Sequence, residues 1–501
     1  MPRGRRLGVS VTFAVARLLA PVVRFVHAHP RLRAHLRVIR RKVRQHGWGR
    51  WRDPLREERR ILNATRPLRE QVKSWAWLAD HSAPLNPVAL ADALATNNER
   101  LVICVSHDDY VLVCGGIQNV IANEHDAFQA DGLSCLHMSP AEPLPVLAPE
   151  GPAESYYLRL RLNGELLGVA SFATLTAAFN VVRDGGMACT HIVHHLKGHA
   201  PEHLASLATG GTRPIVWVHD YFSLCPSFNL LRNDVRYCGG PPPWSAACSV
   251  CVFRDDRAAH QPRVRAYFAA TRPVVVAPSD PALQLWRQRA QLLYAEAHVL
   301  APAMLRMDGE AVGATRMGIG PLRIAHLGAA IPSKGWSVFR SLAEHFAQDP
   351  RYKFHQLGID GSRSRCYVYD PVMVGREDRH AMIREIVRHA IDVAIIWSIW
   401  PETFSFTAHE ALAGGAFVVT HLGAGNVWPA IAANAPDQGI AVDDAAALFA
   451  LFDSGEIVSR VARAPRRRGT LIPGRGTADL IRRMTLPDLA RHPMAPEAAV
   501  P

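Results

Sequence analysis

Two glutamates, Glu402 and Glu410, lie eight positions apart in the segment PETFSFTAHEALAGG, residues 401–415. Carboxylate oxygens accept hydrogen bonds from hydroxyl groups, so two carboxylates at this spacing can bind the two ends of a nucleotide-sugar. They are too far apart to share a proton, since two helical turns separate them. The alternative is a helix with two solvated glutamates, because charged residues on helix faces are most often exposed.

The residues around this pair predict one β-α-β unit. Residues 392–397 (DVAIIW) are apolar and β-branched, which is typical of a buried parallel strand. Residues 404–413 are compatible with a helix, two glycines end it, and residues 416–420 (AFVVT) predict the next strand. Ligands of such units bind where a strand ends and the next helix begins, and the helix N-terminus favours phosphate. Glu402 is therefore expected in a ligand-binding loop.

The same segment resembles the E-x7-E segment of retaining glycosyltransferases with the GT-B fold, specifically glycosyltransferase family 4. Every fixed letter of the family pattern PE-x-F-x-x-x-x-x-EA-x-A-x-G is present. The resemblance implies an α/β fold with two Rossmann-like domains facing a cleft. It also implies that Glu402 contacts the transferred sugar and Glu410 the ribose, with Thr403 and Phe404 in the same donor-binding segment.

A second part of the resemblance lies in the loop AAIPSKG, residues 329–335, between a predicted strand at 323–328 and a predicted helix at 336–346. In the family this loop supplies a lysine, often with an arginine, to the donor diphosphate. Lys334 matches the lysine, but Ala329 stands where the arginine is usual. Either another residue completes the diphosphate site or the enzyme is slow. A solvated lysine is the alternative interpretation of Lys334.

The amino-terminal half resembles the acceptor side of the family. A predicted strand at 101–107 is followed by Gly115 and Gly116, similar to the glycine pair that lets the family's backbone approach donor phosphate and acceptor. A second predicted strand, 214–218, ends at His219. The family commonly has a histidine there, facing the donor sugar, where an imidazole can stabilise an oxocarbenium-like transition state. A structural histidine is the alternative.

Four further histidines follow Cys189 within eleven residues: His191, His194, His195 and His199. Their number suggests a metal site, but no carboxylate or cysteine stands at ligand spacing. We interpret them as part of a polar loop over the cleft that contacts the acceptor.

Four of the nine cysteines fall inside 27 residues with the spacing C-x12-C-x9-C-x2-C: Cys225, Cys238, Cys248 and Cys251. A terminal C-x2-C suits tetrahedral zinc, because one tight turn presents both sulfurs to one ion. A cytosolic chain is expected to cross-link such a segment with metal rather than with disulfides. The prediction is a structural zinc ion and no catalytic metal. Two disulfides, a redox pair and unlinked cysteines are the alternatives.

The net charge of +13 is concentrated in residues 1–60, which hold 17 Lys and Arg against three acidic residues. That segment carries +14, so the other 441 residues sum to −1. Arg17 and Arg24 interrupt its first apolar stretch, which therefore predicts neither a membrane-spanning helix nor a signal peptide. From residue 32 on, helical spacing places four apolar residues on one stripe: Leu32, Leu36, Ile39 and Val43. A row of arginines lies beside this stripe, which is typical of a helix that lies on an anionic membrane surface. A solvated or disordered basic tail is the alternative.

Length and composition allow two sizeable cores, since the chain has 501 residues of which 49% are apolar. We expect a basic arm and linker at 1–95 and an amino-terminal Rossmann-like domain at 96–300 with a cysteine-rich insertion at 225–251. A carboxyl-terminal nucleotide-sugar domain at 301–470 and a tail at 471–501 complete the chain. No GxxxxGK[ST] or G-x-G-x-x-G motif is present, which argues against a kinase, an ATPase or a dehydrogenase. No nucleic-acid-binding motif is present either.

The resulting hypothesis is a retaining glycosyltransferase that moves a hexose-type sugar from a nucleotide-diphosphate donor to a glycan or lipid-linked acceptor, in cell-surface polysaccharide or glycolipid synthesis. His219, Lys334 and Glu402 are the predicted catalytic residues. The protein is expected in the cytoplasm, peripheral at the inner face of the cell membrane. The alternative is a non-catalytic sugar-nucleotide-binding or scaffold protein of the same fold, which the alanine at position 329 leaves open.

Overall fold

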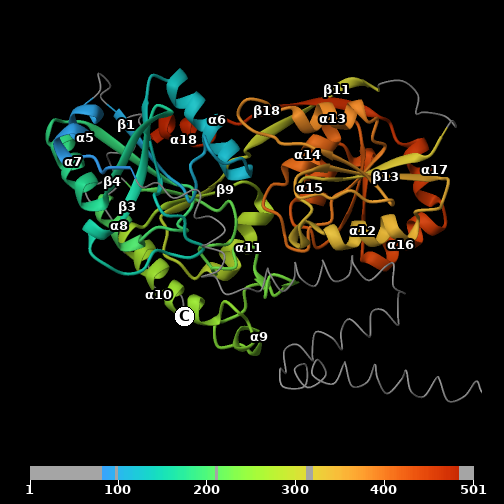
Figure 1. Ribbon diagram of the computed structural model, residues 1–501, viewed down its shortest axis with the longest axis horizontal. Coiled ribbons are helices and arrows are strands. Elements are labelled where there is room, and N and C mark those ends of the chain that lie inside the picture. Colours follow the sequence, from blue (N-terminus) through green and yellow to red (C-terminus); the bar gives the residue numbers. More distant parts are fainter. Residues whose placement is uncertain (1–81, 96–99, 209–212, 312–319, 485–501) are drawn as a thin grey trace, which may run out of the picture. The chain divides into compact units, whose positions relative to one another are not determined.

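The computed structural model (Figure 1) describes four ranges of the 501-residue chain: 82–95, 100–208, 213–311 and 320–484. All of them belong to one compact unit, residues 67–501. The basic arm predicted for residues 1–60 lies outside the described residues.

The first domain is built on an eight-stranded sheet with the order β10-β9-β6-β5-β1-β2-β3-β4. Its strands have these bounds: β1 Arg100–Val105, β2 Ser134–Pro140, β3 Tyr157–Leu162, β4 Glu165–Ser171, β5 Ala188–Val193, β6 Ile215–Trp217, β9 Val274–Ala277 and β10 Glu296–Val299. Six strands are parallel, and β3 and β4 form an antiparallel hairpin at one edge. Strand order reverses between β1 and β5, because β2 lies on one side of β1 and β5 on the other.

Helices cover both faces of this sheet: α5 Pro87–Leu94, α6 Gly116–Ala130, α7 Phe172–Asp184, α8 Pro201–Leu207, α10 Arg254–Thr271 and α11 Asp280–Ala290. Alternate residues of β1 enter two different cores, as the two-residue period of a strand requires. Leu101 and Ile103 pack in the core that includes α5, α7 and α10, whereas Val102 and Cys104 pack with α6. Leu90 and Leu94 of α5 are fully buried in the first of these cores, although they fall in the range expected for the linker.

The second domain has a six-stranded parallel sheet with the order β14-β13-β12-β15-β16-β17. The bounds are β12 Leu322–Leu327, β13 Tyr352–Gly358, β14 Val368–Pro371, β15 Val393–Ile395, β16 Phe417–His421 and β17 Gly439–Val442. In chain order this is 3-2-1-4-5-6, the order of the dinucleotide-binding sheet, with the reversal between β12 and β15. Ligands of such sheets bind at the carboxyl ends of the two strands that flank the reversal.

Two layers of helices enclose the second sheet (Figure 1). One face packs against α13 (Ala381–Arg388), α14 (Phe406–Ala413) and α15 (Val427–Asn434). The other face packs against α12 (Trp336–His345), α16 (Ala445–Asp453) and α17 (Glu456–Arg463). The α/β architecture of two Rossmann-like domains is therefore confirmed.

The chain crosses between the domains twice. β11 (Ala303–Ala311) pairs antiparallel with β18 (Arg467–Pro473), and α18 (Thr477–Met484) then returns to the first domain. Leu480 and Ile481 of α18 pack with Phe128 of α6. The remaining short elements are α9 Ala246–Ser249, β7 Leu231–Arg232, β8 Arg236–Tyr237, and the 3-10 turns η2 Ala153–Ser155, η3 Pro332–Lys334 and η4 Pro436–Gln438.

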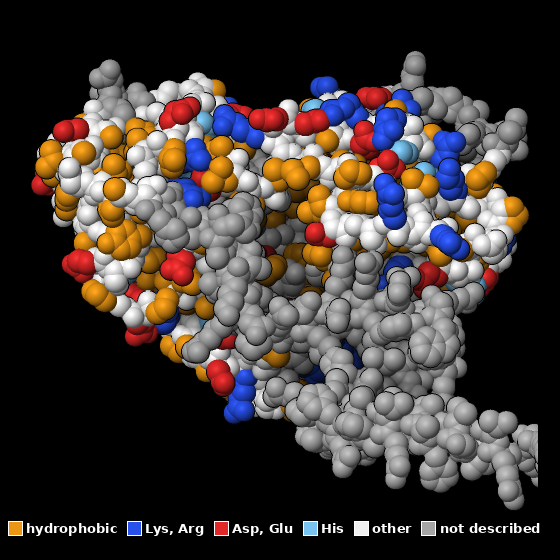
Figure 2. All heavy atoms as spheres, in the orientation of Figure 1, with side chains coloured by type: hydrophobic (Ala, Val, Ile, Leu, Met, Phe, Trp, Pro, Cys, Tyr) orange, Lys and Arg blue, Asp and Glu red, His pale blue; other side chains and the backbone are white. Residues whose placement is uncertain are grey.

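The surface charge of the described residues is mixed. Over the face drawn in Figure 2, Lys and Arg side chains are interspersed with Asp and Glu. This agrees with the sum of −1 for the 441 residues that follow the basic arm. In the described ranges, no helix is both long enough and apolar enough to cross a membrane.

Candidate functional site

Lys334 and Glu402 come from the two loops that flank the reversal of the second sheet. Lys334 ends the turn η3 after β12, and Glu402 lies in the loop between β15 and α14. The Lys334 ammonium donates a hydrogen bond to Glu402 Oε1 at 2.7 Å. Glu402 is buried, whereas the Lys334 side chain is one-third exposed. The structure therefore brings together two predicted site residues that are 68 positions apart, at the end of the sheet where a ligand is expected.

Close backbone packing holds both loops. Gly335 has φ +75°, and a Cβ at this position would lie 1.8 Å from the carbonyl oxygen of Trp397. Gly425 has φ +68°, and its Cβ would lie 2.5 Å from the backbone nitrogen of Glu402. Only glycine allows these two contacts at a positive φ. Ser405, directly before α14, also has a positive φ, +67°, and such strain in a non-glycine residue is typical of functional loops.

Glu402 carries a negative charge in this structure. Burial opposes that charge, but the Lys334 ammonium and the hydroxyls of Ser398 and Ser405 outweigh burial and hold the pKa of Glu402 below its ordinary value. Ser398 Oγ donates a hydrogen bond to the same oxygen that Lys334 contacts. A fixed, ionised acceptor of this kind can orient a sugar hydroxyl.

Glu410 is equally buried but has a different charge state. It lies in the second turn of α14, and burial raises its pKa to about 7, with Lys334 acting weakly in the opposite direction. Among the described residues, none donates a hydrogen bond to its carboxyl group. A buried carboxyl without a partner destabilises the protein unless a ligand donates hydrogen bonds to it.

Thr403 and Phe404 lie in the loop between β15 and α14, and Thr403 connects this loop to the first domain. Thr403 Oγ1 donates to the carbonyl oxygen of His219 at 2.5 Å, and Ser279 Oγ donates to the carbonyl oxygen of Thr403 at 2.6 Å. Phe404 stacks on His409 with ring centroids 4.2 Å apart. Both side chains are thus engaged within the protein, which leaves their backbone rather than their side chains to contact a donor.

His219 follows β6 and is buried beside two aromatic rings. It stacks on Trp217 at 4.6 Å, and its Nε2 lies 3.1 Å from Nδ1 of His194. Burial is the main reason that the pKa of His219 lies well below its ordinary value, and the neighbouring histidines lower it further. The ring is therefore neutral. A neutral imidazole can donate or accept a hydrogen bond but brings no charge to a sugar.

His219 is the end of a buried chain of contacts that begins at the carboxyl-terminal helix. The backbone N–H and the hydroxyl of Thr477, the first residue of α18, each donate to Glu124 at 2.8 Å. Glu124 Oε2 lies 3.3 Å from Nε2 of His194, which contacts His219. This chain fixes the orientation of the His219 ring.

The remaining histidines of the predicted cluster are buried. His195 and His199 lie in the loop between β5 and α8, whereas His191 does not, and contact with an acceptor stays a prediction. His191 is buried within β5, and His195 lies 3.0 Å from Asp220 in a buried pair. His199 is fully buried between Ser106, whose carbonyl oxygen lies 2.7 Å from Nε2, and Tyr156. Successive parallel strands end side by side, so polar residues after β1, β5 and β6 gather under the surface rather than on it.

Gly115 and Gly116 stand at the start of α6, as predicted. Gly115 precedes the first helical residue in an extended conformation. A Cβ on Gly116 would lie 3.6 Å from the ring of Phe406, the first residue of α14. The small residue therefore lies where the first domain contacts the loop that carries Glu402.

Ala329 contributes no charge to the site. Its carbonyl oxygen lies 3.1 Å from Nε2 of His326. Among the described residues, Lys334 is the only cation that shifts the pKa of both Glu402 and Glu410.

The four cysteines of the insertion have other contacts. The Arg257 guanidinium donates to Cys248 Sγ at 2.8 Å, and the Cys238 thiol donates to the carbonyl oxygen of Leu230 at 3.0 Å. Burial raises the pKa of Cys225 to about 12 and also raises that of Cys238. Cys251 is half-buried, and none of the four forms a disulfide. Zinc at this cluster stays a prediction.

A cavity of about 610 Å³ lies in the first domain. Its lining includes two acidic and three aromatic side chains: Glu142, Glu150, Tyr156, Tyr157 and His203. None of the predicted donor-site residues lines it, so it is separate from the site at the second sheet.

Sequence reasoning missed the residues that support this site. Ser398 is the polar residue directly after a predicted apolar strand, and that position was its signal. Glu124 shares a helical stripe with Val120 and Phe128, spaced four residues apart, and an acid on an apolar stripe signals a buried partner. Thr477 had no local signal, because its partner is 353 positions away.

No protein-family model matches the chain, and no curated protein matches it in sequence. Solved structures do resemble it. The sucrose-phosphate synthase of Thermosynechococcus elongatus is 14% identical with a TM-score of 0.46, covering 73% of this chain and 92% of that one. WaaG, a glycosyltransferase involved in lipopolysaccharide biosynthesis, is 13% identical with a TM-score of 0.42, covering 72% and 92%.

HepE of Anabaena, solved in complex with UDP, is 13% identical with a TM-score of 0.39, covering 72% of this chain and 91% of that one. These identities are too low to transfer residue roles. The roles of Lys334, Glu402 and Glu410 therefore depend on the contacts described above.

Proposed function

We propose that this protein is a retaining glycosyltransferase that takes a sugar from a nucleotide-diphosphate donor. The observation that supports it most is the ion pair between Lys334 and Glu402, whose two loops flank the strand reversal of a 3-2-1-4-5-6 sheet. Glu410 is buried in α14, the helix that directly follows the Glu402 loop. Sheets of this order bind nucleotides at that place. The E-x7-E resemblance assigns the same residues to a donor sugar and its ribose.

The donor diphosphate would lie between Lys334 and the first turn of α14. The Lys334 side chain is one-third exposed, so its ammonium can reach a phosphate while the loop stays in place. No side chain caps α14, so the N–H groups of its first two residues, Phe406 and Thr407, are available to phosphate oxygens. Together they stabilise the charge that develops on the leaving diphosphate.

Glu402 and Glu410 would bind the two ends of the donor. Glu402 is ionised and held by Lys334 and Ser398, so it orients hydroxyls of the transferred sugar. Glu410 lacks a donor group within the described residues, and two ribose hydroxyls would supply it. His219, neutral and oriented by His194, would hydrogen-bond the sugar from the first domain.

A retaining outcome is consistent with the absence of a dedicated base among the described site residues. In the family that the E-x7-E segment resembles, the leaving diphosphate is thought to assist attack by the acceptor from the same face. Lys334 would then carry much of the rate enhancement, because it stabilises that diphosphate.

The acceptor is proposed to be a glycan or lipid-linked saccharide, and the reaction a step of cell-surface polysaccharide or glycolipid synthesis. The sequence supports this through the basic arm, whose charge of +14 and apolar stripes suit peripheral attachment at the cytoplasmic face of an anionic membrane. No nucleic-acid partner is proposed.

A non-catalytic sugar-nucleotide-binding protein is the second candidate, and Ala329 favours it because it removes one expected cation. Donor hydrolysis by purified protein separates the two. We expect slow release of free sugar from at least one nucleotide-diphosphate sugar, reduced at least about tenfold in Lys334→Ala but not in the control Lys353→Ala, which lies outside the site. Binding of the donor without any turnover would support the second candidate.

A further inference from the structure

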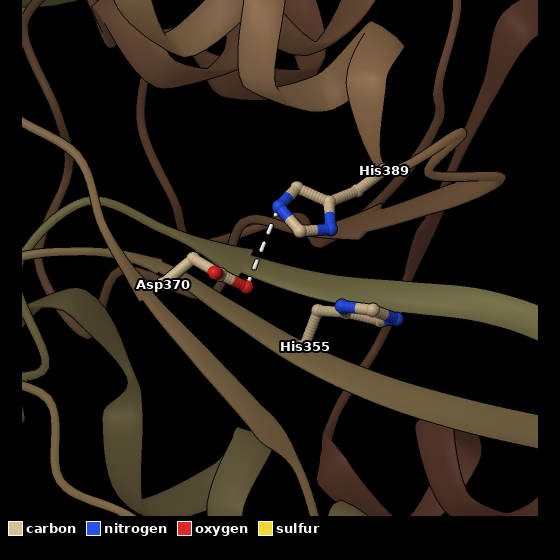
Figure 3. A group of neighbouring side chains, drawn as sticks. All are labelled: His355, Asp370 and His389. Atoms are coloured by element: carbon tan, nitrogen blue, oxygen red, sulfur yellow. Dashed lines mark ion pairs between the residues drawn. The ribbon is translucent and has the colours of Figure 1, made fainter.

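A second cluster of ionisable side chains lies at the edge of the second sheet, apart from the donor-site residues. His355 belongs to β13, Asp370 to the edge strand β14, and His389 directly follows α13 (Figure 3). Their ligand atoms all lie within 4.8 Å of one another. Figure 3 shows that the three side chains come from separate segments and that an ion pair joins His389 to Asp370, at 3.4 Å.

His355 is the most informative member. It is only 4% exposed, and neither of its ring nitrogens has a hydrogen-bond partner. Oδ2 of Asp370 is also buried without a hydrogen-bond partner. Buried polar atoms in folded proteins are nearly always bonded, because a polar atom that loses water without gaining a partner destabilises the fold. The cluster therefore has the donor atoms for a ligand that the protein itself does not supply.

Neighbouring charges suit a cation at this place. Glu385 of α13 lies 3.5 Å from Nε2 of His389 and can serve as a fourth ligand. The cation next to that nitrogen is now the Arg388 guanidinium, which donates to it at 2.7 Å and also pairs with Glu385. The Arg388 side chain is 60% exposed, so it can move into solvent. Arg323 and Lys353 add positive charge near His355, which two carboxylates would offset.

We propose that His355, Asp370 and His389 form a structural site for a divalent transition-metal ion, best fitted to Zn²⁺, with Glu385 as the fourth ligand. Two imidazoles and two carboxylates are ligands that Zn²⁺ accepts in tetrahedral geometry. Hard cations such as Mg²⁺ and Ca²⁺ prefer oxygen ligands alone. Zinc ligands lie at roughly 2.0–2.2 Å, so small side-chain rotations and the departure of Arg388 complete the site.

Such an ion would add a direct link between two paired strands and the end of a helix that packs on them. It would join the edge strand β14 and its neighbour β13 to the end of α13. The ion would stabilise the second domain without contacting the proposed donor, since none of its ligands belongs to the donor-site loops.

The test uses the full-length protein after removal of metal with a chelator. Zn²⁺ is titrated by competition with a chromophoric chelator, and Co²⁺ is added separately as a spectroscopic probe. Asp370→Asn and His389→Gln remove single ligands whose side chains are partly exposed, so the fold is retained, and circular dichroism checks this. His345→Gln is the matched control, because this histidine of α12 is 54% exposed and lies outside the cluster.

We expect wild type and His345→Gln to bind Zn²⁺ with a rise in melting temperature, and each ligand variant to lose affinity at least about tenfold. The visible Co²⁺ absorption that Asp370→Asn and His389→Gln lose should carry no thiolate charge-transfer band, which separates this site from the four cysteines of the insertion. Equal Zn²⁺ affinity in wild type, Asp370→Asn and His389→Gln would overturn the proposal. A Co²⁺ spectrum that is identical in wild type, Asp370→Asn and His389→Gln would overturn it as well.

Discussion

Glu402 and Glu410 show how one short segment can give two carboxyl groups different charge states. Both are about 3% exposed, so burial acts on both alike. Lys334 and two hydroxyls donate hydrogen bonds to Glu402, which stays ionised. Only the charge of Lys334 acts on Glu410, whose pKa is raised by burial to about 7. The difference lies in the hydrogen-bond partners rather than in the burial. We interpret Glu410 as a ligand-binding group kept at the expense of stability.

Replacing Glu410 should therefore stabilise the free protein in a pH-dependent way. Its pKa is raised from an ordinary 4.5 to about 7 in the folded state, so the folded protein loses stability as pH rises between these values. This change in pKa corresponds to a loss of folding free energy of roughly 3 kcal/mol, which is present in full above pH 7 and absent below pH 4.5. We expect Glu410→Gln to increase the free energy of unfolding by up to about that amount at pH 8 and little at pH 5, as measured by urea denaturation.

The control for this measurement is Glu344→Gln, which changes a half-exposed glutamate on α12. It should shift stability by less than about 0.5 kcal/mol at either pH. A Glu410→Gln effect that is the same at pH 5 and pH 8 would contradict the raised pKa.

At the scale of elements, the sequence predicts the strands and helices around the site well, because a buried parallel strand is a short apolar run. The strand expected at 392–397 is β15, Val393–Ile395, and the strand expected at 416–420 is β16, Phe417–His421. The helix expected at 404–413 begins at Phe406 instead, because Ser405 takes a positive φ that no local pattern reveals. Three residues earlier, the backbone of Glu402 is hydrogen-bonded to Ala424 and Asn426, a long-range contact that the local sequence does not reveal either.

The β3-β4 hairpin was not predicted, although its signal is in the sequence. Asn163 and Gly164 both have positive φ, 50° and 90°, as a two-residue hairpin turn requires. Asn-Gly between two alternating segments is a strong hairpin signal. The β-α units on either side of the hairpin predict parallel strands, so an antiparallel hairpin at the edge of the sheet was not expected.

The turn that positions Lys334 depends on Gly335, and this gives a prediction at the scale of the element. Alanine at 335 would place Cβ 1.8 Å from the Trp397 carbonyl oxygen at a φ of +75°. We expect Gly335→Ala to destabilise the protein by roughly 2–4 kcal/mol in denaturant unfolding, through strain and overpacking.

Gly309→Ala is the matched control, since a Cβ on this exposed glycine of β11 meets nothing within 4 Å. Its effect should stay within about 0.5 kcal/mol. If the two substitutions cost the same, the close approach of the β12 and β15 loops is not what holds Lys334 in place.

For the whole molecule, the contacts that complete the site connect residues far apart in the chain. Thr403 bonds to His219 across 184 positions, and Thr477 bonds to Glu124 across 353. Asp126 of α6 also pairs with Arg379 of the second domain at 2.5 Å. A single sequence shows such residues individually but not their pairing, so the motif residues were predictable and their supporting partners were not.

The basic arm lies outside the described residues, and its role as a membrane anchor stays a prediction from sequence. Deleting residues 1–60 removes a charge of +14 and no donor-site residue. We expect the truncated protein to keep donor hydrolysis and to lose sedimentation with vesicles rich in anionic lipid. Salt should release the full-length protein at least in part, because surface attraction fades beyond about 8 Å at physiological ionic strength. Equal vesicle binding by both proteins at low salt would remove the membrane role.

The central claim is that Lys334, Glu402 and Glu410 form the donor site, and calorimetric titration with free nucleoside diphosphates tests it most directly. A panel of nucleoside diphosphates first identifies the base that wild type binds. With that nucleotide, we expect Glu410→Gln to weaken binding at least about tenfold, because the glutamine side chain offers the two ribose hydroxyls one acceptor oxygen in place of two. Glu402→Gln should bind the nucleotide within about twofold of wild type yet abolish sugar transfer. Equal loss of nucleotide affinity in both variants would contradict the assigned division of roles, and unchanged affinity in Glu410→Gln together with unchanged transfer in Glu402→Gln would contradict the site itself.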